Sequence, residues 1–178
     1  MPEDSETELS PFIASLKPGE KLAGCYLLQR AVPGAALPIW LAHDEVLGKD
    51  ISLHFLPPGS LSRSGFGDRL RQEIKKARQL IHPRILRVYD IIEEEEWSAV
   101  AMDAFAGQPL SAVLAQTERG FFECSDVWPL AQQLCETLEE AHRIRLAHGA
   151  LSPQDVIVGD GNAKLKNFGV SASLAEFQ

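Results

Sequence analysis

The sequence predicts an α+β fold, with an antiparallel sheet in its first half and mainly helices in its second half. Short apolar stretches separated by turn residues recur over residues 25–56 and 86–102, which is the pattern of strands joined in a meander. Apolar residues recur at intervals of three and four over residues 68–80 and 125–145, the spacing of amphipathic helices. One sheet followed by helices is the order of elements in an α+β domain.

The first half of the chain supplies five expected strands. The first three are joined by a Pro33-Gly34 turn and by a second break near Gly48, and short connections of this kind favour antiparallel neighbours. Four consecutive glutamates separate the last two strands and read as a solvated hairpin tip. The expected strands are residues 25–32, 37–42, 51–56, 86–92 and 97–102.

Length and charge limit the functions that the chain can have. Its 178 residues, 45% of them hydrophobic and 24% charged, are enough for one domain or two small lobes. The formal net charge is −8, and a chain this acidic lacks the clustered basic face that nucleic acid or an anionic membrane surface requires. We therefore expect no nucleic-acid partner and no membrane contact from this segment.

Cysteine usage and the chain's start indicate a cytoplasmic protein. Cys25, Cys124 and Cys135 are odd in number, far apart and without metal-ligand spacing, which favours reduced thiols over a disulfide framework. The first residues are acidic, so no signal peptide is expected, and no apolar run reaches the ~20 residues that span a bilayer.

The most informative stretch begins at His148 and ends at Gly169. A polar loop, His148 to Asp155, precedes two short apolar strands at residues 156–158 and 163–165, and Asn167-Phe168-Gly169 follows them. This order resembles the catalytic core of the eukaryotic-type (bacterial Ser/Thr) protein kinase family, where His-Arg-Asp-Leu-Lys-Pro-Glu-Asn precedes a hairpin and Asp-Phe-Gly follows it.

Other landmarks extend the resemblance from about Tyr26 to Ala172. His82-Pro83 and the following Tyr89-Asp90 are similar to a stretch common in bacterial members of the family. The resemblance implies a protein kinase-like fold with a five-stranded N-lobe, one regulatory helix and a partial, mainly helical C-lobe. Its expected divisions are a flexible tail at 1–19, an N-lobe at 20–106 and a C-lobe at 107–178.

The residues that carry the family's chemistry are replaced. Gly149 replaces the Arg of the loop, Ala150 its catalytic Asp and Ser152 its Lys, whereas His148 keeps its family identity. Ala150 has no atom that could accept a proton from a substrate hydroxyl. We therefore expect no catalytic residues, only the degenerate equivalents His148, Ala150 and Ser152.

The expected nucleotide site is degenerate as well. Only Gly34 remains of three loop glycines, and His54 stands where the family has a Lys that contacts the phosphates. Glu73 matches the Glu that pairs with this Lys. It either pairs with His54 or is a solvated helix residue. If a nucleotide binds, the resemblance implies contacts with Gly34, His54 and Glu73, and with the hinge residues Asp103 and Phe105.

Two residues could hold a metal ion. Asp155 stands for the family's metal-binding Asn and Asn167 for its metal-binding Asp, so one carboxylate and one amide exchange places. Both groups offer the oxygen ligands that Mg²⁺ and Ca²⁺ take. Alternatively, Asp155 caps the loop and Asn167 supports the Phe-Gly turn. We expect no bound cofactor, since these changes disfavour tight binding of ATP and Mg²⁺.

These losses predict a protein that is not an enzyme, a pseudokinase that serves signalling as a regulatory or protein-interaction module. The alternatives are a divergent Ser/Thr protein kinase domain and a module that senses ATP without transferring phosphate. The family continues beyond the point that Gln178 reaches, so the apolar face of residues 125–145 is expected to stay partly uncovered. We expect a protein partner there, with a homodimer as the commonest solution.

Overall fold

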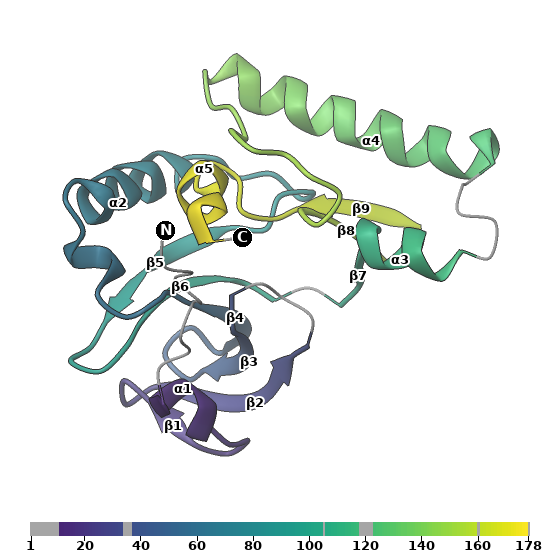
Figure 1. Cartoon of the computed structure of the whole chain (residues 1–178). Helices are drawn as coiled ribbons and strands as arrows, with labels where there is room; N and C mark the ends of the chain where they lie inside the picture. Colours follow the sequence, from purple (N-terminus) through teal and green to yellow (C-terminus); the bar gives the residue numbers. More distant parts are fainter. Residues whose placement is uncertain (1–10, 34–36, 105, 118–122, 160, 178) are drawn as a thin grey trace, which may run out of the picture. The chain divides into compact units, whose positions relative to one another are not determined.

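The computed structural model describes residues 11–33, 37–104, 106–117, 123–159 and 161–177, and these form two compact units (Figure 1). The first unit consists of Met1–Gln72, Tyr89–Ala104 and Ala175–Gln178, and the second of Glu73–Val88 and Phe105–Leu174. The consecutive lobes at 20–106 and 107–178 that the sequence analysis expects stay a prediction. The segment before Tyr89 joins the second unit because Ile85 forms a parallel bridge with Leu165.

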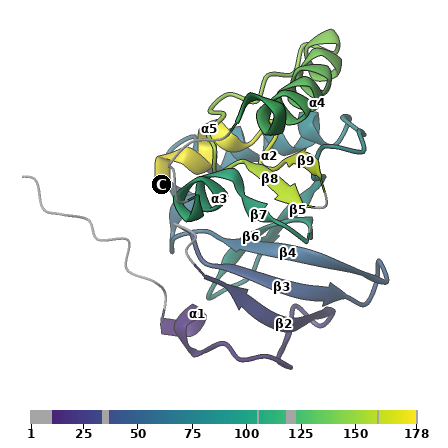
Figure 2. The same ribbon diagram turned by 90° about the vertical axis from the view of Figure 1, so that its right-hand side faces the viewer.

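The first unit contains a six-stranded sheet in the order β1-β2-β3-β4-β6-β5, and Figure 2 shows its β2, β3 and β4 side by side. The five predicted strands are present with ends shifted by at most two residues, and β1 is an additional edge strand. The strands are β1 (Lys21–Leu22), β2 (Tyr26–Val32), β3 (Ile39–Asp44), β4 (Lys49–Phe55), β5 (Val88–Glu93) and β6 (Ser98–Asp103).

One face of this sheet forms the core of the first unit. Alternating residues of β3 and β4 point into it, as the two-residue period of a strand requires, and they include Trp40, Ala42 and Leu53. Helix α1 (Pro11–Ser15) adds Ile13 to the same cluster. The sequence predicts a flexible tail here. An ordered helix forms from residue 11 because packing Ile13 removes apolar surface from water.

The first unit also contains the short 3-10 helices Ser60–Ser62 and Ala175–Phe177. Helix α2 (Phe66–Ala77) begins in this unit and ends in the second. Its predicted apolar residues Leu70, Ile74 and Ala77 are all buried, so the amphipathic pattern is confirmed. The aromatic ring of Phe66 lies edge-on to Phe177, with ring centroids 5.2 Å apart.

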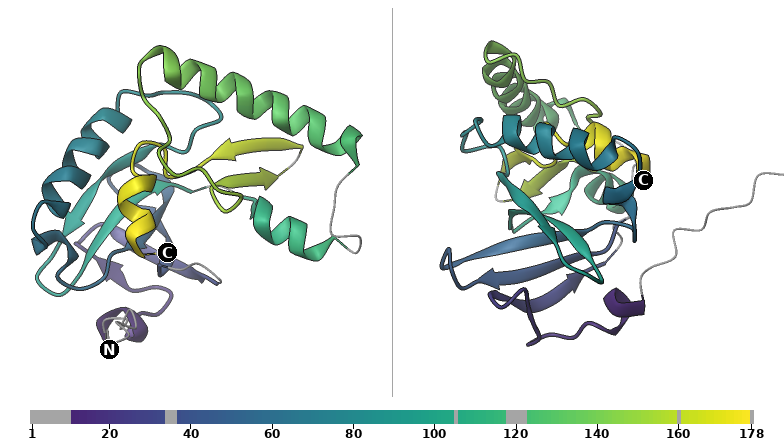
Figure 3. Two further views of the ribbon diagram at one scale, coloured as in Figure 1. Left: turned by 45° about the horizontal axis from the view of Figure 1, so that its top comes forward. Right: turned by 90° about the vertical axis from the view of Figure 1, so that its left-hand side faces the viewer.

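The second unit is mainly helical around a three-stranded sheet of order β7-β8-β9. Helix α4 packs against β9, and the two elements lie side by side in Figure 3. The elements are β7 (Gln108–Pro109), α3 (Leu110–Gln116), α4 (Cys124–Arg143), β8 (Val156–Gly159), β9 (Asn162–Leu165) and α5 (Ser171–Leu174). No helix among the described residues combines the length and the apolar character needed to cross a membrane.

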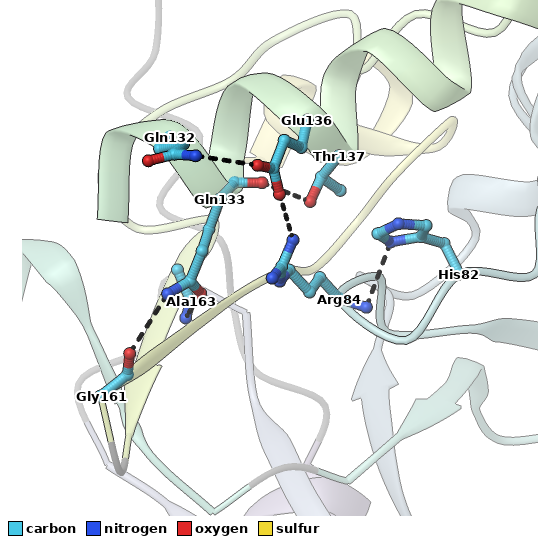
Figure 4. A network of polar contacts seen from close by, with 8 residues as sticks. All are labelled: His82, Arg84, Gln132, Gln133, Glu136, Thr137, Gly161 and Ala163. Carbon is cyan, nitrogen blue, oxygen red and sulfur yellow. Dashed lines mark hydrogen bonds and ion pairs between the residues drawn. The ribbon is translucent and has the colours of Figure 1, made fainter. Parts of the chain in front are cut away.

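Polar contacts fix the register of α4 on the hairpin (Figure 4). The Gln133 side chain accepts the backbone N–H of Ala163 at 3.0 Å and donates to the carbonyl of Gly161 at 3.3 Å. Arg84 forms an ion pair with Glu136 at 2.8 Å, which ties the segment before β5 to the same helix. The β8–β9 hairpin therefore has a fixed position relative to α4 within the second unit.

The apolar face of α4 is covered along part of its length. Leu130, Leu134 and Leu138 are partly buried and pack against the core of the second unit. Val127 and Ile144, which the sequence places on the same face, are 40% and 50% exposed. A homodimer through this helix stays a prediction.

Candidate functional site

Asp155 and Asn167 lie together at one end of the β8–β9 hairpin. Asp155 directly precedes β8, and Asn167 follows β9 by one residue, so the antiparallel pairing of Val156 with Leu165 brings the two side chains together. The Asn167 amide Nδ2 donates to Asp155 Oδ1 at 2.9 Å, and each residue is only 2% exposed. The structure thus joins the two residues that the sequence proposes as metal ligands.

Ser152 and Lys166 fix the position of Asp155. Its carboxylate Oδ2 accepts hydrogen bonds from the Ser152 backbone N–H at 3.0 Å and from the Ser152 hydroxyl at 2.7 Å. Its backbone carbonyl accepts the N–H of Lys166 at 2.9 Å. These are the loop-capping contacts considered as the alternative role of Asp155, and they leave Oδ1 on the side of Asn167.

The side-chain amide oxygen of Asn167 lacks a hydrogen-bond donor among the described residues. Its Oδ1 is buried and has no hydrogen-bond partner within the described part of the chain. Its backbone φ is 58°, in the left-handed region that Asn tolerates better than most residues. A buried acceptor without a donor costs free energy, so this oxygen is available to a ligand that the described residues do not include.

The residues present fit a divalent cation. Asn167 Oδ1 has both lone pairs open, and Asp155 Oδ1 accepts one hydrogen bond and has room for one further ligand. No group of three or more His, Cys, Asp and Glu side chains able to hold a metal occurs in the ranges that the structure describes. Mg²⁺ suits so small a ligand set, since it commonly takes one or two protein oxygens and completes its shell with phosphate and water.

His148 helps to hold this loop in place through its two ring nitrogens. Its Nε2 lies 2.9 Å from the carbonyl oxygen of Lys166, which can only accept, so Nε2 carries the proton. Its Nδ1 lies 3.0 Å from the hydroxyl of Ser171, and its ring meets Phe168 edge-on with centroids 5.2 Å apart. Burial lowers the pKa of His148, while the Lys166 carbonyl and the charge of Asp155 act in the opposite direction.

Ser171 also anchors the loop backbone. Its hydroxyl accepts the N–H of Ala150 at 3.2 Å and donates to the backbone carbonyl of His148. Gly149 between them has a φ of 96°, which only glycine adopts at little cost. The loop is therefore held in place although Ala150 offers no proton acceptor. The sequence analysis missed Ser171 because no motif includes it.

The low pKa of His148 predicts a loss of stability in acid. The folded protein binds the proton more weakly than the unfolded chain, so the free energy of unfolding falls as the pH drops from about 6.5 towards the folded pKa. We expect His148→Gln, which keeps an N–H donor, to flatten this part of the profile. Urea unfolding of both proteins between pH 7.5 and pH 5 measures it. Parallel profiles would show that His148 is not the group responsible.

Lys166 is a second residue of the site that the sequence analysis missed. Its side chain is half-buried, and burial lowers its pKa while the charge of Asp155 opposes this shift. The available signal was its position directly before Asn167, on the polar side of an alternating Ala163-Lys164-Leu165-Lys166 pattern. A lysine there adds a cation beside the metal position.

The remaining predicted nucleotide contacts are distributed over the chain. His54 is buried on β4 in the first unit, with its Nε2 3.1 Å from the Ser52 hydroxyl, and Asp103 at the end of β6 accepts from Lys49 at 3.2 Å. Glu73 lies in the second unit, and its pairing with His54 stays a prediction. Gly34 and Phe105 lie outside the described residues.

Comparison with known proteins identifies the relatives of this chain. The model of the protein kinase domain matches residues 59–178. The serine/threonine-protein kinase PrkC of Bacillus subtilis is 24% identical over 159 residues, covering 88% of this chain and 24% of that protein. PknA of Mycobacterium tuberculosis, also named a serine/threonine-protein kinase, is 28% identical over 163 residues, covering 88% of this chain and 37% of PknA.

Solved structures agree with the fold. The crystal structure of the M. tuberculosis PknI kinase domain superimposes with a TM-score of 0.76 and 25% identity, covering 88% of this chain and 62% of that one. The kinase-like α+β fold predicted from the sequence is confirmed. The chain spans about a quarter of the length of the first curated relatives that it matches.

These findings correct one expectation. The sequence analysis predicts that the chain is not an enzyme, because Ala150 and Ser152 replace catalytic residues of the loop. The relatives are named serine/threonine-protein kinases, which points to an enzyme, and that prediction is wrong. Counting lost side chains gave too much weight to individual groups in a reaction that depends mainly on positioning and charge.

Proposed function

Because this chain belongs to the protein kinase domain family, we propose that it is a divergent serine/threonine protein kinase domain that binds ATP with Mg²⁺. The observation that carries the proposal is the buried pair of Asp155 and Asn167, with an unpartnered amide oxygen at the metal position. This proposal replaces the expectation that no cofactor binds, which no structural observation tests.

Each neighbouring residue has a role in this proposal. Asp155 and Asn167 would hold the metal, which neutralises charge on the phosphate oxygens when it is bound. Ser152 orients the Asp155 carboxylate through two hydrogen bonds. His148 and Ser171 hold the loop backbone through the carbonyl of Lys166 and the N–H of Ala150.

Ala150 makes the proposed transfer slow without abolishing it. General-base catalysis contributes about 10²–10⁴-fold, while positioning and charge neutralisation supply most of the acceleration in phosphoryl transfer. A domain that lacks the base but holds the metal and the phosphates keeps the larger part of the rate acceleration. The lack of an acceptor at Ala150 also favours a second candidate, an ATP-sensing module that binds nucleotide without transfer.

The three thiols fit the cytoplasmic setting that we propose for this domain. Cys25, Cys124 and Cys135 are all free, and the last two are exposed. Exposed unpaired thiols are typical of reducing compartments.

Transfer of radiolabel from γ-labelled ATP tests the kinase proposal. We expect slow incorporation into the protein itself or a generic Ser/Thr substrate in the presence of Mg²⁺. Asp155→Asn should lower it by about tenfold or more, since a neutral amide holds Mg²⁺ less tightly than a carboxylate. Asp155→Asn, purified in parallel, is also the control for contaminating kinases, because a contaminant would label both preparations equally. Equal incorporation by both proteins, or none by the wild type, would reject transfer by this site, and nucleotide binding without incorporation would support the sensing module.

A further inference from the structure

We propose that the ammonium group of Lys166 binds the phosphates of the nucleotide and takes the place of the two lysines that the chain lacks. Those positions hold His54 and Ser152. This inference rests on the proposed function and adds to it the residue that would contact the anionic part of the ligand.

The backbone of Lys166 is fixed on both sides. Its N–H donates to the Asp155 carbonyl at 2.9 Å, and its carbonyl accepts the His148 Nε2–H at 2.9 Å. The preceding residue, Leu165, is completely buried in the core of the second unit, and the following residue is Asn167. The root of the lysine side chain is therefore held directly beside the two proposed metal ligands.

The alternation along β9 sets the direction of the side chain. Ala163 and Leu165 face the core on which α4 packs, whereas Lys164 and Lys166 are half-buried residues of the opposite polar side. Asp155 and Asn167 lie at the same end of the hairpin. The charge of Asp155 acts on the Lys166 ammonium, so this lysine adds a cation near the carboxylate and amide, and such groups hold a metal ion together with a phosphate.

The electrostatic state of Lys166 supports an anionic ligand. Within the described ranges its ammonium forms no hydrogen bond or ion pair, although the charge of Asp155 acts on it. The side chain is half-buried, so its ammonium has little access to water, and it has no charged hydrogen-bond partner in these ranges. A phosphate oxygen would accept its protons, and a compact ammonium on a flexible stem is a common phosphate ligand.

Nucleotide affinities of matched variants test this role. Calorimetric titration with Mg²⁺ and ATP should show that Lys166→Met weakens ATP binding by about 10- to 100-fold, the range for a lost hydrogen bond between charged groups. Adenosine, which has no phosphate, should bind Lys166→Met and wild type within about twofold, because only the phosphate contact is removed. Lys164→Met, on the same side of the hairpin, is the control and should bind ATP within about twofold of wild type.

Chemical labelling gives a second readout that does not depend on activity. Acetylation of lysines in the wild-type protein, followed by peptide mapping, should show that Mg²⁺ with ATP slows modification of Lys166 but leaves that of Lys164 unchanged. Equal protection of both lysines, or of neither, would count against the contact.

The outcomes separate the two proposals. If the wild type binds ATP and Lys166→Met binds it equally tightly, the role of Lys166 is overturned and the proposed function still stands. A wild type that binds no ATP would reject the proposed function and this inference with it. Selective loss of ATP affinity in Lys166→Met supports both.

Discussion

Asp155→Ala is expected to lower the free energy of unfolding by about 3–5 kcal/mol, because it leaves one buried and two partly buried donors without an acceptor. The carboxylate accepts hydrogen bonds from the Ser152 backbone N–H, the Ser152 hydroxyl and the Asn167 amide. All three donors lie close to a residue that is only 2% exposed, so water cannot readily replace the carboxylate. Urea unfolding followed by circular dichroism measures the difference.

Asp155→Asn is the matched control for this effect. It has nearly the same shape and keeps one acceptor oxygen, so it should cost only about 1–2 kcal/mol. A loss below about 1 kcal/mol for Asp155→Ala would contradict the arrangement, since one buried and two partly buried donors cannot lose their acceptor at so small a cost.

Regular elements with a long repeating pattern were predictable from the sequence. The amphipathic spacing predicted α4 to within two residues at each end, and apolar stretches bounded by turn residues predicted β3 and β4. The strands β1 and β7 contain two residues each, so they carry no period, and pairing with β2 and β8 defines them. For α1 the sequence indicates no more than a weak turn near Phe12–Leu16 in a flexible tail, because only Ile13 and its neighbours supply its packing.

Most residues of the candidate site were visible in the sequence, and Ser171 and Lys166 were not. Asp155 and Asn167 were found because they occupy spaced motif positions beside a hairpin, and the antiparallel register then brings them together. Ser171 was not found because its bond to His148 links residues 23 positions apart through the fold. The role proposed for Lys166 depends on burial and on missing partners, which a sequence pattern does not display.

If ATP binds as proposed, we expect the charges around Asn167 to set how strongly the binding depends on Mg²⁺. Replacing Asn167 by Asp places a second carboxylate against Asp155 Oδ1, where the amide now donates at 2.9 Å. Without metal the two carboxylates repel each other, and with metal both become ligands. Asp also tolerates the left-handed φ of 58° at this position. We expect Asn167→Asp to bind ATP more tightly than wild type with Mg²⁺ and more weakly without it.

Calorimetric titration of the wild-type chain with ATP, in the presence of Mg²⁺ and again with a chelator, tests the central claim most directly. The account predicts binding that weakens by at least about tenfold when Mg²⁺ is removed, equivalent to ~1.4 kcal/mol. Asn167→Asp should widen this difference. Equal affinity with and without Mg²⁺, or no binding of ATP in either condition, would contradict the account.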